Sequence, residues 1–587
     1  MTEIPIPSQP AAGGWDDPRN GRPPVHPSTS VAGRLLCAGT YIDGGYRDRV
    51  IDELYVHEER IAAPSYGFDA ARVLAHALRA RRAELGWAAG VLGAWFVGAL
   101  LTGGALLLLL IPFLAFRLAG WLRARGSALL RFLGLVVRVY AAIFLILVVL
   151  GLLGTGIALT DLVTDGPGGG LPFGDDPYES SYGSYGPYGS SDSSALAVGA
   201  GLIWGTGAVF AALVTLVALQ RGHVAKTIAT DLSPDRYADQ AADPAEAAPG
   251  ARLTRILRRI RREQWSPLVV YDINDPLCGA GDPFRPWHLS VELRPRDDLG
   301  LDRKPTPLDN THILGKVVPR LQGLRVPSRH GSAQAEAAVM DRLRELVIEE
   351  CVFVPATGLP HRDAAPVTAE AFAEHRAASV EEGGEQRRHF LRVRVGGWDE
   401  NLVVTVFVRV HTQGGMLMLE VAPHVLLPLP VHFLNADADA QRYLNNHWFG
   451  KAVWALVNTP RSFTAAVLTL CRGLASWWRI VTGGHGGARP EGAWASVRQI
   501  ASQDNGTIFH LMDFDRYLKT IQDRVVAGVT EALHEAGWHT EEFAQRAINV
   551  AEGGVFIQSV NQSAFTVGGS GHTNNVNQAV KGSSGGK

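Results

Sequence analysis

The chain has 587 residues and a formal net charge of −2, from 55 basic and 57 acidic residues. This balance argues against a protein whose main task is to bind a polyanion, so nucleic acid is not an expected partner. Hydrophobic residues make up 47% of the chain and charged residues only 19%. Soluble domains carry roughly 25% charged residues, so this composition indicates that part of the chain does not face water.

The N-terminal 85 residues divide into two segments. Residues 1–30 are rich in proline and glycine and lack an apolar core, which predicts a disordered start without a secretory signal peptide. Residues 31–85 mix apolar and charged positions and predict a cytoplasmic segment of two or three helices, broken at Pro64. The stretch His57-Glu58-Glu59 looks like the start of a zinc-protease HExxH helix, but Ile61 replaces its second histidine, so no metal ligand is expected.

Three uncharged, apolar blocks follow within residues 86–220, at 86–116, 139–160 and 195–220. Each is longer than the roughly 20 residues that a helix needs to cross a bilayer, which predicts a helical transmembrane region. The first block is interrupted at Thr102-Gly103-Gly104, so it is expected to form a hairpin of two helices, 87–101 and 105–122.

Arginine placement predicts the orientation of these blocks. Arginines flank the first block on both sides and follow the third, whereas the loop 161–194 has no lysine or arginine and is expected to lie outside. Its glycine, serine and tyrosine content predicts disorder. With the N-terminal flank and the later flanks all inside, the number of crossings must be even, which favours four. Three crossings, with Arg79 to Arg82 outside, are the alternative.

Residues 221–262 read as a linker that ends in a basic amphipathic helix. Leu253, Ile256, Leu257 and Ile260 recur at helical spacing and form an apolar stripe. Beside a span that ends in the cytoplasm, the helix is expected to lie on anionic lipids of the inner leaflet or to pack its stripe on the next domain. The residues expected to bind the membrane surface are Arg252, Arg255, Arg258, Arg259, Arg261 and Arg262.

Residues 263–552 predict a cytoplasmic α+β domain. Alternating apolar residues in 389–395, 404–410 and 416–421 predict a three-stranded antiparallel meander whose arginines face solvent. Strands are also expected at 266–272 and 288–293. Helices are expected at 333–350, at 436–459 with an end at Pro460, and from about 513 to 550. The segment 462–481, with Trp477 and Trp478, suits either an interfacial helix or a core helix.

The last 35 residues, 553–587, are rich in asparagine, glutamine, serine and glycine and carry short apolar alternations. Such segments stack into cross-β ladders. The stretch FTVGGSGHTNN resembles the amyloid signalling motifs of bacteria, which are similar to the RIP homotypic interaction motif. The resemblance implies self-association, or templating of a partner with a like motif. A flexible polar tail is the alternative. The residues expected to carry self-association are Val555, Ile557, Phe565, Val567 and Gly568.

The chain contains no spacing typical of a catalytic, cofactor-binding or metal-binding motif, so no catalytic residue, cofactor or metal is expected. Its arrangement resembles multi-pass membrane proteins of high-GC bacteria, and that resemblance implies no activity. We therefore expect a non-enzymatic scaffold or sensor of the cell membrane, whose large C-terminal part is cytoplasmic. The broken first block makes a transporter or channel subunit one alternative, and a membrane-anchored enzyme in residues 263–550 is the other.

Overall fold

The structure of the protein is a computed structural model. It describes residues 27–144, 146 and 191–551, except for 109, 125–126, 248–249, 299–303, 382–383, 385, 398–400, 503–505 and most of 326–345. Three segments for which disorder or assembly is expected therefore lie largely outside the described residues, namely the N-terminus, the loop 161–194 and the tail 553–587.

The N-terminal region is helical, as the sequence predicts. After a 3-10 turn at Pro27–Thr29 it consists of α1 (Val31–Ile42), α2 (Gly44–Ile51), a π-helical turn at Asp52–Val56 and the start of α3 (Ala70–Leu101). Asp69 caps α3, because its carboxylate accepts hydrogen bonds from the backbone N–H groups of Ala71 and Arg72. The break expected at Pro64 lies in the extended segment before this cap.

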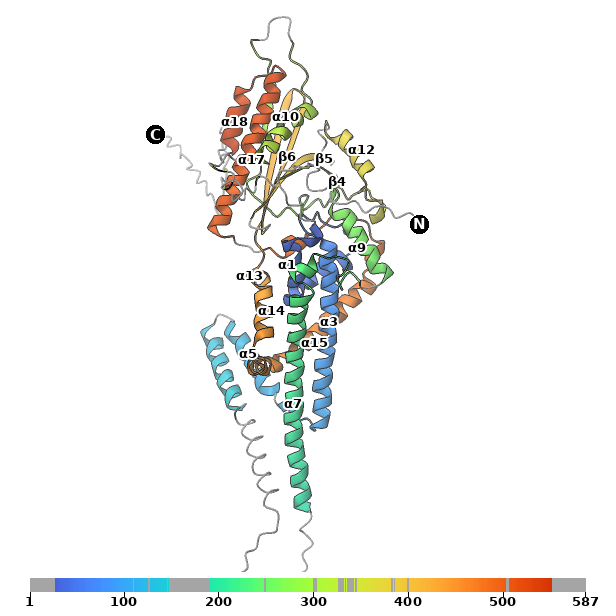
Figure 1. The fold of residues 1–587 in the computed structure, drawn as a ribbon, viewed down its shortest axis with the longest axis vertical. Coiled ribbons are helices and arrows are strands. Elements are labelled where there is room, and N and C mark those ends of the chain that lie inside the picture. The colour runs from blue at the N-terminus through green and yellow to red at the C-terminus, as the bar shows by residue number, and fades with distance from the viewer. Residues whose placement is uncertain are drawn as a thin grey trace, which may run out of the picture.

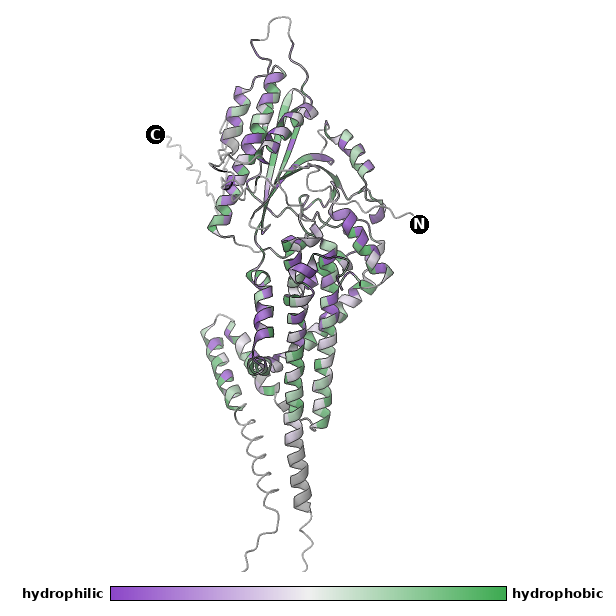
Figure 2. Cartoon of the chain, viewed as in Figure 1, coloured by the Kyte–Doolittle hydropathy of each residue, from purple (hydrophilic) through white to green (hydrophobic). Residues whose placement is uncertain are grey.

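Two helices among the described residues are long and apolar enough to cross a membrane. They are α3 and residues Trp204–Thr230 of α7 (Ser191–Thr230). Their uncharged portions lie side by side, away from the sheet domain, and pack against Ala466 and Phe463 (Figure 2). A Cβ atom at Gly98 of α3 would lie 2.4 Å from Cγ1 of Val209 on α7, so glycine permits a close approach of the two backbones.

The first apolar block is broken where the sequence predicts. Helix α3 ends at Leu101, and Gly103 and Gly104 adopt φ angles of 57° and 89°, which residues with a Cβ rarely adopt. The chain then turns back through α4 (Ala105–Leu108) and α5 (Leu110–Ala124) (Figure 1). Residues 128–144 form a further helix, and the second apolar block is described only in part. This part of the structure supports the hairpin and leaves the number of crossings open.

The linker after α7 contains α8 (Pro234–Tyr237) and ends in α9 (Ala251–Gln264). The apolar stripe of α9 is buried, with Ile260 fully enclosed, in a core shared with α1, α2, α3 and α14 (Ala436–Asn445). Of the two expectations for this helix, the structure therefore shows the one in which the apolar stripe packs inside the protein.

The described part of residues 263–552 contains a seven-stranded mixed sheet in the order β1-β4-β5-β6-β7-β2, with β3 also paired to β7. Strand β1 runs parallel to β4 and the other pairs are antiparallel. The strands are β1 (Leu268–Tyr271), β2 (Asp282–Pro283), β3 (Trp287–Glu292), β4 (Val347–Pro355), β5 (Arg388–Gly397), β6 (Leu402–Gln413) and β7 (Met416–Leu426). The predicted meander is confirmed as β5, β6 and β7.

The two faces of this curled sheet have different cores (Figure 1). On one face, Leu391, Val393 and Val395 pair with valines of β6 and pack with α10 (Asn310–Gln322), α17 (Ile508–Glu535) and α18 (Glu541–Ala551). On the other, Phe353, Phe390 and Phe407 stack edge to face near Tyr66 of the N-terminal region. Helix α12 (Ala369–Ser379) lies beside β4 and β5.

Three expectations for the sheet and for the helices that pack on it are wrong. Residues 347–350 are the start of β4 and not the end of a helix, because antiparallel pairing with β5 decides their structure. The predicted helix 513–550 is two helices, since Gly537 with a φ of 86° ends α17. Arg392 does not face solvent but is buried, because Glu349 and Tyr66 accept its hydrogen bonds.

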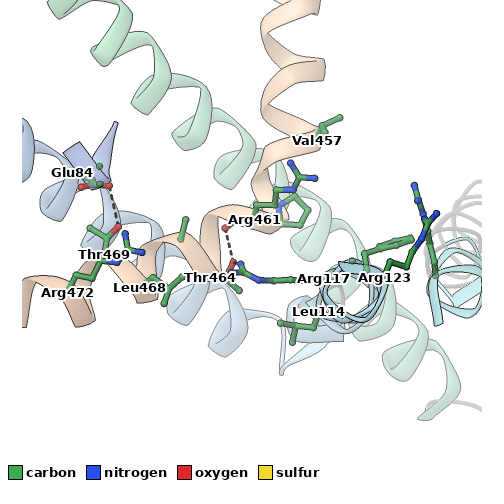
Figure 3. A pocket seen from close by; sticks show the side chains of 17 residues that line it. Glu84, Leu114, Arg117, Arg123, Val457, Arg461, Thr464, Leu468, Thr469 and Arg472 are labelled. Carbon is green, nitrogen blue, oxygen red and sulfur yellow. Dashed lines mark hydrogen bonds between the residues drawn. The ribbon is translucent and has the colours of Figure 1, made fainter. Parts of the chain in front are cut away.

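The connection from β7 to α17 passes through α13 (Val431–Leu434), α14 (Ala436–Asn445), α15 (Trp448–Thr482) and α16 (Val497–Ile500). Pro460 does not end a helix as expected, because α15 continues through it. Proline lacks an N–H and clashes with the preceding turn, so it bends the helix instead. The ribbon of α15 changes direction beside Arg461 (Figure 3). Trp477 and Trp478 are 56% and 60% exposed, so this segment is not a core helix.

Candidate functional site

A cavity of about 980 Å³ lies where α15 crosses α3 and α5. Five arginines from three helical segments line it, and we call it the arginine pocket (Figure 3). The arginines are Arg117, Arg123, Arg138, Arg461 and Arg472.

One face of α15 forms a wall of the pocket. Val457, Arg461, Thr464, Leu468 and Arg472 are lining residues. They are spaced three or four residues apart, which places them on a single side of a helix. The sequence pattern of α15 therefore presents two guanidinium groups, a hydroxyl and apolar side chains to the same cavity.

The opposite wall comes from α5 and from the helix 128–144. Leu114, Arg117 and Arg123 of α5 line the cavity, and Arg138 contributes from the following helix. A Cβ atom at Gly134 would lie 2.8 Å from the carbonyl oxygen of Ala119, so this glycine lets the two helices approach closely. The guanidinium of Arg117 donates a hydrogen bond of 2.7 Å to Thr464 Oγ1 and joins the two walls (Figure 3).

The pocket carries uncompensated positive charge. Glu84 is the acidic lining residue, and its carboxylate is already paired with Arg47 and accepts a 3.3 Å hydrogen bond from Thr469. Within the described residues, the side chains of Arg123, Arg138, Arg461 and Arg472 make no ion pair or hydrogen bond. Guanidinium groups bind phosphate and carboxylate in a bidentate manner, so this arrangement suits an anionic ligand.

The pocket lies at a boundary along α3. Glu84 is the last charged residue of this helix, and residues 86–101 carry no charge. On α7, residues 204–220 are likewise uncharged and Arg221 follows them. If α3 and α7 span a bilayer, the pocket is at the level of the lipid headgroups, where arginine and tryptophan are favoured.

A second cavity of about 300 Å³ lies between the sheet and the N-terminal region, and its charged groups are paired with one another. Glu350 accepts hydrogen bonds from Arg376 and lies 2.9 Å from His389 Nε2. Burial alone would raise the pKa of Glu350, but the hydrogen bonds from His389 and Arg376 lower it to about 2. Because this network satisfies itself, the second cavity is less suited to a charged ligand than the arginine pocket.

The residues expected from the sequence to bind membrane lie elsewhere, on α9. Arg252, Arg259 and Arg261 form ion pairs with Glu58, Asp363 and Asp69. Arg255 and Arg258 are exposed. The expected self-association residues of the tail lie outside the described residues, and membrane binding by α9 stays a prediction.

The sequence did not single out the arginine pocket, because its walls are far apart along the chain. Arg117 and Thr464 are 347 positions apart. The available signal was the spacing of Val457, Arg461 and Leu468 in α15, at i, i+4 and i+11, which places arginine and apolar side chains on one side of the helix. Three further side chains, His57, Glu59 and His485, come together outside both cavities and are residues that could hold a metal ion.

The fold thus combines two helices that are long and apolar enough to cross a membrane with a mixed sheet domain. Comparison with known families matches part of it. Residues 286–564, somewhat less than half of the chain, match the model of the AbeC-like domain. This match includes β3 to β7, the bent helix α15 and the two C-terminal helices. No curated protein and no solved structure matches the chain.

Proposed function

We propose that this protein is a non-enzymatic membrane sensor or scaffold that binds an anionic phospholipid headgroup in the arginine pocket. The supporting observation is the set of five arginines around a cavity whose acidic residue, Glu84, is already neutralised by Arg47. An anionic headgroup would supply the missing negative charge.

The mixed lining of the pocket supports a lipid over a free anion. Leu114, Val457 and Leu468 line the same cavity as the arginines. A phosphate would contact the guanidinium groups while the first methylenes of the acyl chains contact these apolar side chains. Near a membrane surface each arginine contributes about 1 kcal/mol to the attraction of anionic lipid.

The exposed apolar surface of α15 supports the same placement. Trp448, Trp454, Trp477 and Trp478 are all more than a third exposed, and Arg479 lies beside the last two. Tryptophan and arginine favour the region between hydrocarbon and water. In this proposal α15 lies in the membrane interface and communicates lipid occupancy to the AbeC-like domain, to which it belongs.

The proposed topology has four crossings, with the N-terminal helices and the C-terminal domain both in the cytoplasm. The arginine-rich flanks support it, and so does the reversal of the chain at Gly103 and Gly104. Reporters of cytoplasmic and outside location, fused after Glu84, after Arg125 and after Lys587, are expected to read inside at all three sites. An outside reading after Glu84 would establish three crossings instead.

Neutralising the pocket is expected to weaken binding of anionic lipid by roughly 100-fold. The variant carries Arg117→Gln, Arg461→Gln and Arg472→Gln, and the loss of about 3 kcal/mol follows from about 1 kcal/mol for each arginine. The measurement is titration of the full chain in neutral detergent with fluorescent phosphatidylglycerol. Fluorescent phosphatidylcholine gives the charge-independent reference.

The matched control changes two exposed arginines of α9, Arg255→Gln and Arg258→Gln. This control is expected to bind phosphatidylglycerol as the unaltered chain does. Unchanged binding by the pocket variant would refute the proposal. If the α9 variant alone lost affinity, the lipid surface would be α9, as the amphipathic pattern first indicated.

A further inference from the structure

Two histidines and a glutamate from opposite ends of the chain form a compact cluster. His57 and Glu59 follow the π-helical turn of the N-terminal region, and His485 starts the 3-10 turn after α15. Glu59 Oε1 lies 2.6 Å from Nδ1 of His57 and 3.1 Å from Nδ1 of His485. The two imidazole rings are 4.4 Å apart between centroids.

The carboxylate of Glu59 is buried and incompletely satisfied. Its side chain is 7% exposed, and Oε2 has no hydrogen-bond partner among the described residues. Burial of a carboxylate oxygen without a partner is costly. A bound cation would satisfy this group, whereas the hydrogen bonds of the two histidines engage only Oε1.

The backbone around the cluster is built to hold these groups in place. Gly483 and Gly484 precede His485, and a Cβ atom at Gly483 would lie 2.3 Å from Nε2 of His485. Gly484 has a φ of 62°, in the left-handed region. The backbone N–H of Glu491 donates a 3.0 Å hydrogen bond to the carbonyl oxygen of Glu59, which ties the two segments together.

A second carboxylate lies on the other side of His57. Asp52 Oδ2 is 3.9 Å from Nε2 of His57, and Asp52 also pairs with Arg479 at the end of α15. Histidines that bind metal through one ring nitrogen usually have a carboxylate or carbonyl near the other, which fixes the orientation of the ring. Asp52 is placed for this role.

We propose that His57, Glu59 and His485 bind a divalent cation of the zinc class. Two imidazole nitrogens and one carboxylate oxygen form a ligand set that Zn²⁺ prefers, with a fourth position left for water. The ligand atoms lie within 4.8 Å of one another. Bonds of about 2.0 to 2.1 Å would hold them roughly 3.4 Å apart, so small side-chain rotations complete the site.

The ion would fasten the end of α15 to the N-terminal region. His485 belongs to the AbeC-like match and the other two ligands do not, so the cation links that domain to the helices that precede the membrane region. This inference does not depend on lipid binding. A variant that loses lipid binding can still be tested for cation binding, and a variant that loses cation binding can still be tested for lipid binding.

The test is a Co²⁺ titration of the full chain. The protein is purified without a histidine tag and is first treated with a chelator to remove bound metal. One equivalent is expected to produce the visible absorption of a four-coordinate cobalt ion, and Zn²⁺ is expected to displace it. The variants His57→Ala, His485→Ala and Glu59→Gln are each expected to bind at least 100-fold more weakly. His288→Ala, which alters an exposed histidine on β3, is the control and is expected to bind normally.

A second measurement covers the case in which a variant folds poorly. Zn²⁺ is expected to raise the thermal unfolding midpoint of the unaltered chain, and EDTA is expected to reverse the rise, because the ion binds only the folded state. A featureless Co²⁺ titration of the unaltered chain would overturn the proposal. So would normal Co²⁺ affinity in the His485→Ala variant.

Discussion

Replacing Asp243 by alanine is expected to lower the free energy of unfolding of the N-terminal helical region by about 4 kcal/mol. Asp243 is 3% exposed and lies in the linker after α7. Its Oδ2 accepts a 2.8 Å hydrogen bond from Nε of Arg72 and lies 3.0 Å from Nε2 of His76. Both partners are fully buried on α3, so alanine would leave an uncompensated cation in the core.

The remaining contacts of Arg72 explain why the network cannot simply rearrange. The guanidinium donates a 2.9 Å hydrogen bond to the carbonyl oxygen of Tyr237 and lies 3.6 Å from the centre of its ring. It also donates to the carbonyl oxygen of Ser28. These contacts hold the charge in place without neutralising it. Asp243 therefore ties the linker to α3, and Arg72 extends this network to Ser28 at the start of the helical region.

The stabilisation by Asp243 is also expected to depend on pH. Burial alone would raise the pKa of this carboxyl, but the hydrogen bond and charge of His76 and the charge of Arg72 lower it below its ordinary value of 3.8. A lowered pKa in the folded state means that the contribution is complete above about pH 4 and declines as the pH falls further. The difference in the free energy of unfolding between the unaltered chain and the Asp243→Ala variant is therefore expected to be constant above about pH 4 and to shrink at lower pH.

Urea unfolding in detergent, followed by near-ultraviolet circular dichroism, measures both effects. The control is Asp439→Ala, which removes an ion pair with Arg442 on the surface of α14. Exposed pairs contribute little, so this variant is expected to unfold almost as the unaltered chain does. Equal unfolding of the two variants would show that the buried network is not a major source of stability.

How much of the fold could be predicted depends on whether the deciding contacts are local. The alternation of Val404, Val406 and Val408 predicts a strand with one buried face, and β6 has one. The glycines at 103 and 104 predict a break, because their backbone angles are a property of the residues themselves. The apolar stripe of α9 predicts an amphipathic helix, although only the structure shows that the stripe packs inside the protein.

The sites could not be predicted in the same way, because each joins residues far apart in the chain. Glu59 and His485 are 426 positions apart, and a search for metal motifs on a single helix cannot pair them. Whether Pro460 ends or bends its helix depends on tertiary contacts that support the bent form, and these contacts are not local either. Which distant segments pack together decides both the sites and the bend in α15, and a single sequence does not show directly which segments pack together.

Replacing Arg392 by methionine is expected to destabilise the sheet domain by about 3 kcal/mol, because it breaks a buried ion pair. Arg392 on β5 donates hydrogen bonds to Glu349 on β4 and, at 3.1 Å, to the hydroxyl of Tyr66. Burial alone would raise the pKa of Glu349, but the charges of Arg392 and Arg394 lower it. Without Arg392, the charge of Arg394 still favours the ionised Glu349 carboxylate, but the hydrogen bond from Arg392 is lost.

The double variant Arg392→Met, Glu349→Met separates the value of the pair from the cost of an unpaired charge. Replacing both members of a buried pair by apolar residues of similar volume is often neutral or stabilising, so the double variant is expected to be more stable than Arg392→Met alone. Urea unfolding of the three proteins measures the difference, with Arg294→Met as a control in an exposed pair with Glu292. A double variant that is no more stable than Arg392→Met would show that the unpaired Glu349 carboxylate is not the source of the loss. A double variant that is less stable than the unaltered chain would show that the ion pair stabilises the domain more than the apolar residues do. Both variants also lose the hydrogen bond from Arg392 to Tyr66, which ties the sheet to the N-terminal region, since Tyr66 lies outside the AbeC-like match.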